Sequence, residues 1–229
     1  MEYLKWKEET VSDFSDENIS RMYENGFVFT RLGKGVMNQT RSLRVDLNKF
    51  ELSSENRRIL NKTQGLNLFE HAIPYSNYDW TIHKMGKDFY EKKFGEKTFS
   101  AQKIKELITD KDKSNFNRLF VYVIPARAGI QTLDSRLHGN DNPVAYCIAL
   151  ETKNILHYCY PFYRTSDLEF RISNLGMGMM LKAIVWAKEN NKRYFYLGSF
   201  QRPTDIYKLQ FSGLEWFDDF LAGFWRARS

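Results

Sequence analysis

The sequence predicts an α+β fold, and three stretches in its second half support this class. Two runs of strand-forming residues, 144–150 and 155–163, have the pattern of a hairpin-like pair. A helix is predicted over 175–190, because apolar residues recur there at three-to-four spacing. The run 194–198 is too short for a helix and is rich in strand formers. With 229 residues, 42% of them hydrophobic, the chain can build one large domain or two small ones.

The first half of the chain is predicted to hold short helices and strands. Ser15 and Ser53 stand at helix starts, because each is followed by acidic residues and then by an apolar pattern. The alternation of Leu43, Val45 and Leu47 with polar residues predicts a strand with these three on one face. In order, we expect a helix at 15–23, strands at 26–29 and 43–47, helices at 53–62, 78–94 and 104–108, a strand at 117–123, and an aromatic tail at 216–221 that packs back on the sheet.

Composition sets limits on partners and compartment. The formal net charge of +6 is compatible with a nucleic-acid partner and equally with a protein whose surface is simply basic. No apolar run reaches membrane-spanning length, and the first residues, from Met1 to Lys5, lack the apolar core of a signal peptide. The sequence therefore predicts a cytoplasmic protein, a monomer, without a membrane partner.

Cysteines and histidines give no metal site. The two cysteines, Cys147 and Cys159, exclude a cysteine-based zinc site and a disulfide framework. They fall on consecutive predicted strands, where they can face each other, and we expect free thiols in the core. The four histidines are scattered along the chain, so we expect no metal and no tightly bound cofactor.

The start of the helix at 175–190 is the first candidate site. It carries Leu175, Gly176, Met177 and Gly178, directly ahead of the apolar helical pattern. A strand followed by a glycine-rich helix start directs free backbone N–H groups and the positive end of the helix dipole at an anion. Glycine also lets a ligand approach the backbone closely. The alternative is an ordinary strand–helix unit whose helix start contains glycine.

A basic cluster is the second candidate site. Arg44 lies in the predicted strand at 43–47, and Arg57, Arg58 and Lys62 lie in the helix at 53–62. Together they are candidates for a phosphate-binding face. A solvated, charged helix is the alternative.

The stretch 123–141 has no useful periodicity and separates two strands that would otherwise form a simple hairpin. It resembles the translation of a palindromic repeat element found scattered through bacterial genes. We therefore predict an inserted loop at 123–142, with an active-site lid as the alternative. Deleting 124–141 is expected to leave the protein folded and active; an unfolded or inactive product would contradict the insertion.

Short motifs over most of the chain, apart from this loop, share one order and spacing. They are Tyr23-Glu24-Asn25-Gly26-Phe27, Leu43-Arg44-Val45, Phe50, the run 54–60, Tyr160-Pro161-Phe162-Tyr163, Leu175-Gly176, Tyr194-Phe195-Tyr196-Leu197-Gly198, Tyr207-Lys208, Phe211 and Leu214-Glu215. In this order they resemble the arginyl-tRNA–protein transferase family and its bacterial relatives, the aspartate/glutamate leucyltransferases.

The resemblance implies a fold like that of the Gcn5-related N-acetyltransferases. Its central sheet would be mixed and mostly antiparallel, with flanking helices and a small N-terminal extension. Residues 1–70 would form the N-terminal region of the family, and residues 71–229 the acetyltransferase-like catalytic domain. The family's cysteine cluster is missing from 33–40, and Ser173 stands where the acetyltransferase phosphate motif has Arg or Gln.

The resemblance also implies a reaction: transfer of Leu or Arg from charged tRNA, the co-substrate, to the N-terminal amine of a protein that begins with an acidic residue. Tyr207 would donate a proton to the departing ribose oxygen, and Lys208 would hold a phosphate or the acceptor's acidic side chain. The backbone N–H groups of 175–178, or alternatively the strand edge at 160–163 that ends in Tyr163, would serve the oxyanion or the terminal phosphate. Arg44, Arg57, Arg58 and Lys62 would contact the tRNA backbone or the acceptor carboxylate.

Three alternatives stay open from the residues alone. Tyr207 and Lys208 can be ordinary surface residues that pack and form an ion pair. The protein can be an acyl-CoA-dependent N-acyltransferase of the same fold, using acetyl-CoA. It can also be a non-catalytic relative that binds tRNA or acidic N-termini.

Overall fold

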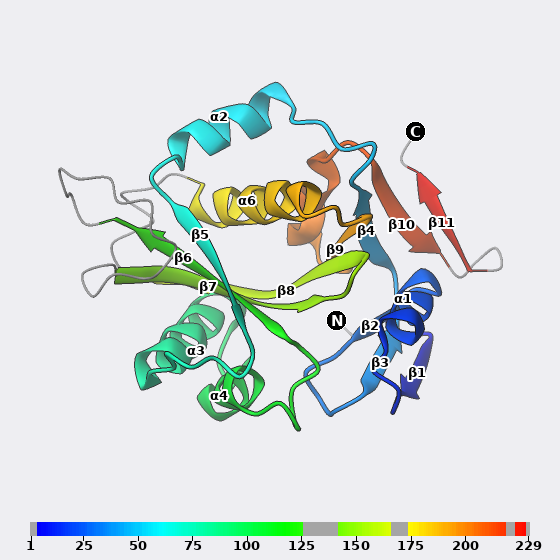
Figure 1. Ribbon diagram of the computed structural model, residues 1–229, viewed down its shortest axis with the longest axis horizontal. Coiled ribbons are helices and arrows are strands. Elements are labelled where there is room, and N and C mark those ends of the chain that lie inside the picture. Colours follow the sequence, from blue (N-terminus) through cyan, green and yellow to red (C-terminus); the bar gives the residue numbers. More distant parts are fainter. Residues whose placement is uncertain (1–3, 126–141, 166–173, 219–222, 228–229) are drawn as a thin grey trace.

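The computed structural model describes residues 4–125, 142–165, 174–218 and 223–227 (Figure 1). Its helices are α1 (Asp16–Glu24), α2 (Ser54–Lys62), α3 (Trp80–Phe94), α4 (Ala101–Thr109), α6 (Leu175–Glu189) and the 3-10 helix η1 (Pro203–Gln210). Its strands are β1 (Lys7–Thr10), β2 (Phe27–Phe29), β3 (Val36–Gln39), β4 (Ser42–Asp46), β5 (Asn67–Ala72), β6 (Arg118–Ile124), β7 (Asn142–Glu151), β8 (Ile155–Tyr163), β9 (Tyr194–Ser199), β10 (Leu214–Asp218) and β11 (Phe224–Ala227).

Eight of these strands form one large mixed sheet in the order β11-β10-β4-β9-β8-β7-β6-β5. Neighbouring strands are antiparallel except for β8 and β9, which are parallel and joined through α6. A parallel neighbour needs a crossover, and the helix supplies it. The prediction of an α+β fold with a mostly antiparallel sheet and flanking helices is therefore confirmed.

Helices cover both faces of the sheet (Figure 1). On one face α6 and α2 pack over Leu43, Val45 and Leu47, which share one cluster as their alternation predicted. On the other face α3 and α4 pack over a second cluster. In β6 the pleat sends successive residues to opposite clusters: Leu119 goes to one and Phe120 to the other. None of the helices within the described residues is long and apolar enough to cross a membrane.

The N-terminal region contributes to the large sheet. Strand β4 lies between β10 and β9, although β1, β2 and β3 form a small sheet of their own. The predicted division at residue 70 falls inside β5. The large sheet thus draws strands from both sides of that division.

Strands β8 and β9 separate beyond their first residues. Their parallel pairing covers Ile155 to His157 on β8 and ends at Tyr196 on β9, while β8 continues to Tyr163. Past this point β9 keeps its pairing with β4. The edges of the two strands diverge below α6, and the cavity described in the next section is lined in part by the end of β8.

Part of the predicted insertion, residues 126–141, lies outside the described residues. Its flanks do not: Ile124 at the end of β6 pairs with Asn142 at the start of β7. A connection at this point therefore joins two adjacent antiparallel strands. The predicted tail at 216–221 packs on the sheet as β10 as far as Asp218, and its last three residues are outside the description. Cys147 and Cys159 are free thiols in different clusters, so they do not face each other.

His157 lies buried where β8 and β9 part, with Nδ1 2.8 Å from the Tyr23 hydroxyl oxygen. Burial and then the Lys208 charge lower the pKa of His157 to about 3. The unfolded chain, with a histidine pKa near 6.5, then binds a proton that the folded protein excludes, so stability falls as pH drops below about 6.5. We expect a loss of about 1.4 kcal/mol per pH unit between pH 6 and 4 from this group. Urea unfolding of wild type and His157→Gln across this range measures it; identical slopes for both proteins would contradict the assignment.

Candidate active site

The start of α6 has no side-chain cap. Its N-cap, Asn174, is left-handed with φ of 65° and makes no capping hydrogen bond through its side chain. The N–H of Gly178 donates to the Asn174 carbonyl oxygen at 2.9 Å, which closes the first turn. Within the described chain, the N–H groups of Leu175, Gly176 and Met177 donate to no acceptor. Among the described residues these three N–H groups have no acceptor, and they lie at the positive end of the helix dipole.

The other four described α-helices begin differently. In each, a side-chain oxygen of the N-cap residue accepts a backbone N–H of the first turn, which is the usual solution for these donors. The capping residues are Ser15, Ser53, Asp79 and Ser100. The uncapped start of α6 is thus a local exception in a protein whose helices are otherwise capped.

A cavity of about 290 Å³ opens at this helix start. It is lined mainly by apolar and aromatic groups from four elements and contains one charged side chain, that of Lys93. The lining residues are Phe89 and Lys93 of α3, Pro161 and Tyr163 of β8, Asn174, Leu175, Gly176, Met177 and Met180 at the start of α6, and Tyr207 of η1. We call it the α6 cavity. It joins Tyr163, Tyr207 and residues 175–177 of the sequence-predicted site.

Tyr163 and Lys93 are placed by aromatic contacts. The Tyr163 ring centroid lies 4.7 Å from that of Phe89, edge to face. The Lys93 ammonium lies 5.2 Å from the Phe89 ring centroid and 5.9 Å from the Tyr163 centroid. A Cβ on Gly176 would lie 3.4 Å from the Tyr163 ring, so the helix backbone passes close to this ring at the cavity.

Tyr207 reaches the cavity from η1. Gln210 ties this segment to α6, because its Nε2 donates to the Met177 sulfur at 3.5 Å and to the Tyr207 carbonyl oxygen at 2.7 Å. The tyrosine exposes 41% of its surface, and the burial of the remainder, followed by the Asp205 charge, raises the pKa of Tyr207 to about 12. The phenol therefore keeps its proton at neutral pH and can donate it.

Lys208 and Gly178 are sequence neighbours of residues that line the cavity, but they do not line it themselves. The Lys208 ammonium is buried, donates to the Ser199 carbonyl oxygen at 2.7 Å and lies 3.7 Å from Asp205. Burial lowers the pKa of this lysine. It anchors η1 to the end of β9 and does not face solvent as a phosphate ligand would. Gly178 lies about 200° around the helix from Gly176, against Thr63 at the end of α2.

The predicted basic cluster divides into a buried and an exposed part. Arg57, Arg58 and Lys62 are exposed on α2, where the Arg58 Nε donates to Glu55 at 2.6 Å. Because α2 contacts α6 on the Gly178 side, these groups lie across the width of α6 from the cavity. Arg44 is separate from them, in the middle of the sheet.

Arg44 is 6% exposed, and its Nε donates to Glu215 at 2.8 Å. Its guanidinium carbon lies 3.8 Å from the Tyr194 ring centroid and 4.0 Å from that of Trp225. A buried pair between two rings holds β4 against β10, and it leaves no face of Arg44 for tRNA. The sequence pattern did not reveal this, because the partners are remote in the chain.

Arg44→Met is therefore expected to lower the free energy of unfolding by about 3–5 kcal/mol, because Glu215 would keep a buried charge after losing its closest partner. Urea unfolding measures the change, with Arg57→Met on exposed α2 as the matched control, expected within about 0.5 kcal/mol of wild type. Unchanged stability with weakened tRNA binding in Arg44→Met would instead place this arginine at the RNA.

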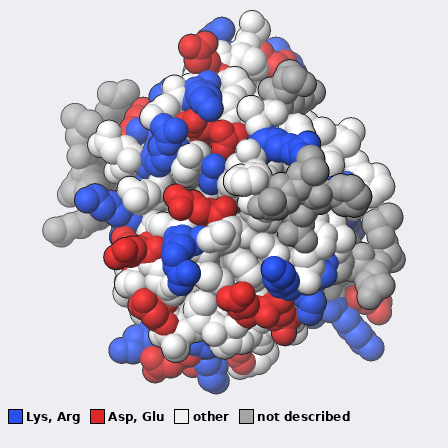
Figure 2. Space-filling model, turned by 90° about the vertical axis from the view of Figure 1, so that its right-hand side faces the viewer, with Lys and Arg blue, Asp and Glu red and all other residues white. Residues whose placement is uncertain are grey.

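Charges are interspersed on the face that carries α1, β10 and β11. Figure 2 shows Lys and Arg side chains next to Asp and Glu over this surface, without an extended area of one sign. Such a face does not favour a polyanion over other partners. Within the described residues no group of three or more His, Cys, Asp or Glu side chains is placed to hold a metal ion.

Comparisons with known proteins found similar solved structures but no related sequences. No family model matches the sequence, and no curated protein matches it. L-PGS from Bacillus licheniformis aligns with 82% of this chain at 14% identity and a TM-score of 0.46, and FemX with 82% at 10% identity and a TM-score of 0.46. A GCN5-related glucosamine N-acetyltransferase region of a fungal multi-domain β-N-acetylglucosaminidase aligns with 93% at 11% identity and a TM-score of 0.46. The alignments cover 54%, 60% and 23% of those chains, so this chain spans little more than half of the first two.

Proposed function

We propose that the protein is an aminoacyltransferase that moves an amino acid from charged tRNA to the N-terminal amine of a protein or peptide beginning with an acidic residue. The observation that supports this most is the uncapped start of α6, which opens into a cavity shared with Tyr163 and Tyr207. The sequence resemblance supplies the class of reaction, and the cavity supplies the groups it needs.

The aminoacyl ester would bind with its carbonyl oxygen at the N–H groups of Gly176 and Met177. These donors are fixed by the helix and have no acceptor of their own among the described residues, so they can stabilise the oxyanion that forms on attack. The volume of about 290 Å³ lies at the lower end of known ligand pockets. It suits an amino-acid side chain and ester better than a whole nucleotide, which would remain outside.

The ester, the acceptor amine, Tyr207 and solvent account for every bond and proton in this reaction. The acceptor amine, after losing its ammonium proton to solvent, attacks the ester carbon, and a C–N bond forms. The C–O bond to the ribose then breaks. Tyr207 gives its proton to the leaving ribose oxygen, and the nitrogen releases one proton, which restores the phenol through solvent. Positioning and oxyanion stabilisation carry the rest of the barrier.

The lining favours leucine over arginine as the transferred residue. Phe89, Met177 and Met180 offer apolar surface, whereas the charged lining group is the Lys93 ammonium and none of the lining residues carries a carboxylate. An arginyl side chain would place its guanidinium against this apolar surface, with no carboxylate among the lining residues to pair with. We expect leucyl-tRNA to be preferred at least about tenfold, a difference of ~1.4 kcal/mol that one uncompensated charge readily exceeds.

The experiment is transfer from leucyl-tRNA, arginyl-tRNA or labelled acetyl-CoA onto peptides that begin with Asp, Glu, Lys or Arg, followed by mass spectrometry. N-acetylated peptides serve as the control. Leucine on the Asp- and Glu-started peptides supports the proposal. Acetyl transfer alone would support the acyl-CoA-dependent alternative, and binding of tRNA or peptide with no product from any donor would support the non-catalytic one.

A further inference from the structure

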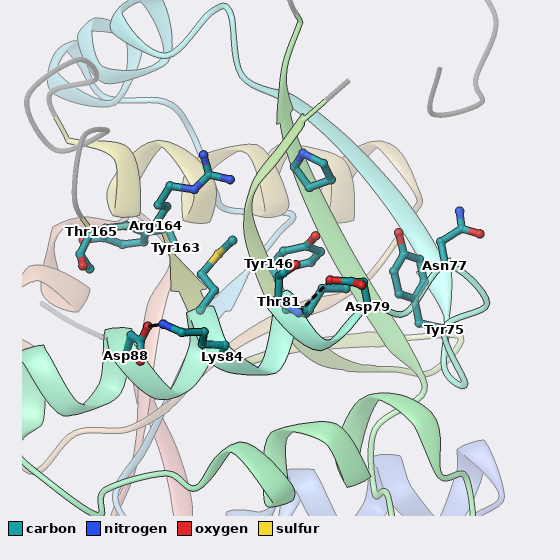
Figure 3. A pocket seen from close by; sticks show the side chains of 13 residues that line it. Tyr75, Asn77, Asp79, Thr81, Lys84, Asp88, Tyr146, Tyr163, Arg164 and Thr165 are labelled. Carbon is teal, nitrogen blue, oxygen red and sulfur yellow. Dashed lines mark hydrogen bonds and ion pairs between the residues drawn. The ribbon is translucent and has the colours of Figure 1, made fainter. Parts of the chain in front are cut away.

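A second cavity is also lined by Tyr163. Its volume is about 650 Å³, and it is formed by the start of α3, the start of β7 and the end of β8 (Figure 3). Tyr163 lines both this cavity and the α6 cavity, which makes it the side chain that the two spaces share. We call the larger space the α3 cavity.

A tyrosine with a largely buried ring, Tyr146, lines the α3 cavity. Tyr146 is 4% exposed and stacks on Phe162 with ring centroids 5.5 Å apart. Its hydroxyl makes no hydrogen bond to any residue in the described part of the chain, and it lines a space large enough for a ligand to supply one.

Two opposite charges flank this phenol. In Figure 3 Tyr146 lies between Arg164 on one side and Asp79 on the other. Burial raises the pKa of Tyr146, and the charges of Arg164, which lowers it, and of Asp79, which raises it, both act on the hydroxyl. Lys84 and Asp88, also in the lining, pair with each other at 2.5 Å. Asp79 and Arg164, in contrast, form no ion pair with a described residue.

Asp79 stays charged at neutral pH. Its Oδ1 accepts the Thr81 N–H at 2.8 Å, and the hydrogen bonds from Thr81 lower the pKa of the carboxyl. The wall therefore offers an anion, a cation and a hydrogen-bonding phenol in one row. A ligand with an ammonium group and a separate carboxylate would complement all three.

We infer that the α3 cavity binds the amine acceptor, a peptide amino terminus with an acidic first side chain, whose ammonium faces Asp79 and Tyr146 and whose side-chain carboxylate faces Arg164. This inference rests on the proposed function, which requires an acceptor next to the acyl donor. Because Tyr163 lines both cavities, the inferred acceptor site borders the side chain that also lines the α6 cavity. Proximity of this kind is the main requirement of a two-substrate transfer.

The test is isothermal titration of an Asp-started peptide, the same peptide with an acetylated N-terminus, and an Ala-started peptide, in the absence of tRNA. Wild type is expected to bind the Asp-started peptide at least tenfold more tightly than the acetylated one. Asp79→Asn should lose at least tenfold in affinity for the free amine while keeping its helix cap, since Asn caps as well as Asp. Arg164→Gln should weaken binding of the Asp-started peptide and leave the Ala-started one unchanged.

Matched controls separate binding from folding. Asp13→Asn removes a carboxylate that also accepts an N–H two residues on, that of Ser15 at 2.8 Å, and should bind like wild type. Tyr146→Phe should lose about threefold to tenfold in peptide affinity without a lower melting temperature. Tyr158→Phe, a buried tyrosine in the cluster under α6, should not change peptide binding.

The outcomes distinguish this inference from the proposed function. Equal peptide affinity in wild type, Asp79→Asn and Tyr146→Phe, or no peptide binding by wild type, would overturn the α3 cavity as the acceptor site even if leucine transfer occurs. Amine-dependent binding that Asp79→Asn abolishes, together with no transfer from any charged tRNA, would support the site and remove the proposed reaction.

Discussion

Gly176→Leu is expected to lower the rate of aminoacyl transfer by about 100-fold or more without destabilising the protein. A Cβ at this position points at the Tyr163 ring, 3.4 Å away, so a leucyl side chain would enter the α6 cavity where the ester must lie. Displacement of the reacting carbonyl by about 1 Å costs this much. Because leucine favours helix more than glycine, by up to about 1 kcal/mol, stability should stay the same or rise. Single-turnover transfer and thermal unfolding of the same preparation measure both effects.

Gly178→Ala is the matched control. It should lower stability and leave transfer nearly unchanged, the opposite of Gly176→Leu. Its Cβ would lie 2.5 Å from a Thr63 methyl carbon, so α2 and α6 must move apart. We expect a loss of about 1–3 kcal/mol in stability and near-normal transfer per folded molecule. If Gly176→Leu stays active, or if both variants lose activity only in proportion to their folded fraction, the helix start is not the donor site.

Tyr207→Phe should lower the rate constant of transfer by about 100-fold to 10,000-fold, the range for loss of a positioned proton donor. The ring remains to line the cavity, so the KM for charged tRNA should change little. Since the pKa of Tyr207 is about 12, the phenol is protonated over the whole accessible range, and the wild-type rate should not fall up to about pH 10 through this group.

Single-turnover rates from pH 6 to 10, with saturating charged tRNA, measure the loss. Ile206→Ala, at the exposed neighbouring position of η1, is the control and should transfer like wild type. A rate for Tyr207→Phe within threefold of wild type would show that solvent protonates the leaving oxygen without the phenol.

Local patterns predicted much of the fold. The helix starts at Ser15 and Ser53 and the inward face of β4 follow from capping chemistry and from alternation, which act within a few residues. Strand β5, with its partly exposed residues, and the short edge strands β1 and β11 escaped prediction. The pairing partners of β5 and β1 are distant in sequence, and the side chains of all three strands carry no clear alternation.

From the sequence, the candidate site was predictable only for residues that belong to a short motif. The glycine-containing helix start was visible in the sequence, and so was Tyr207 through the resemblance. Phe89 and Lys93, which come from α3, join the cavity by tertiary packing alone. The same packing buried Arg44 and Lys208, whose charge suggested exposure: each found a partner, Glu215 or the Ser199 carbonyl, that no short pattern specifies.

The central claim is that the backbone N–H groups at the start of α6 bind the carbonyl of the acyl donor. The most direct measurement is the two-dimensional NMR spectrum of the protein labelled with ¹⁵N-glycine, titrated with a leucyl-adenosine analogue whose ester is replaced by an amide. The Gly176 amide signal is expected to shift downfield with saturation, and the Gly178 signal, from an N–H already bonded to Asn174, to stay nearly unchanged. Saturable binding of the analogue with no shift at Gly176 would contradict the account.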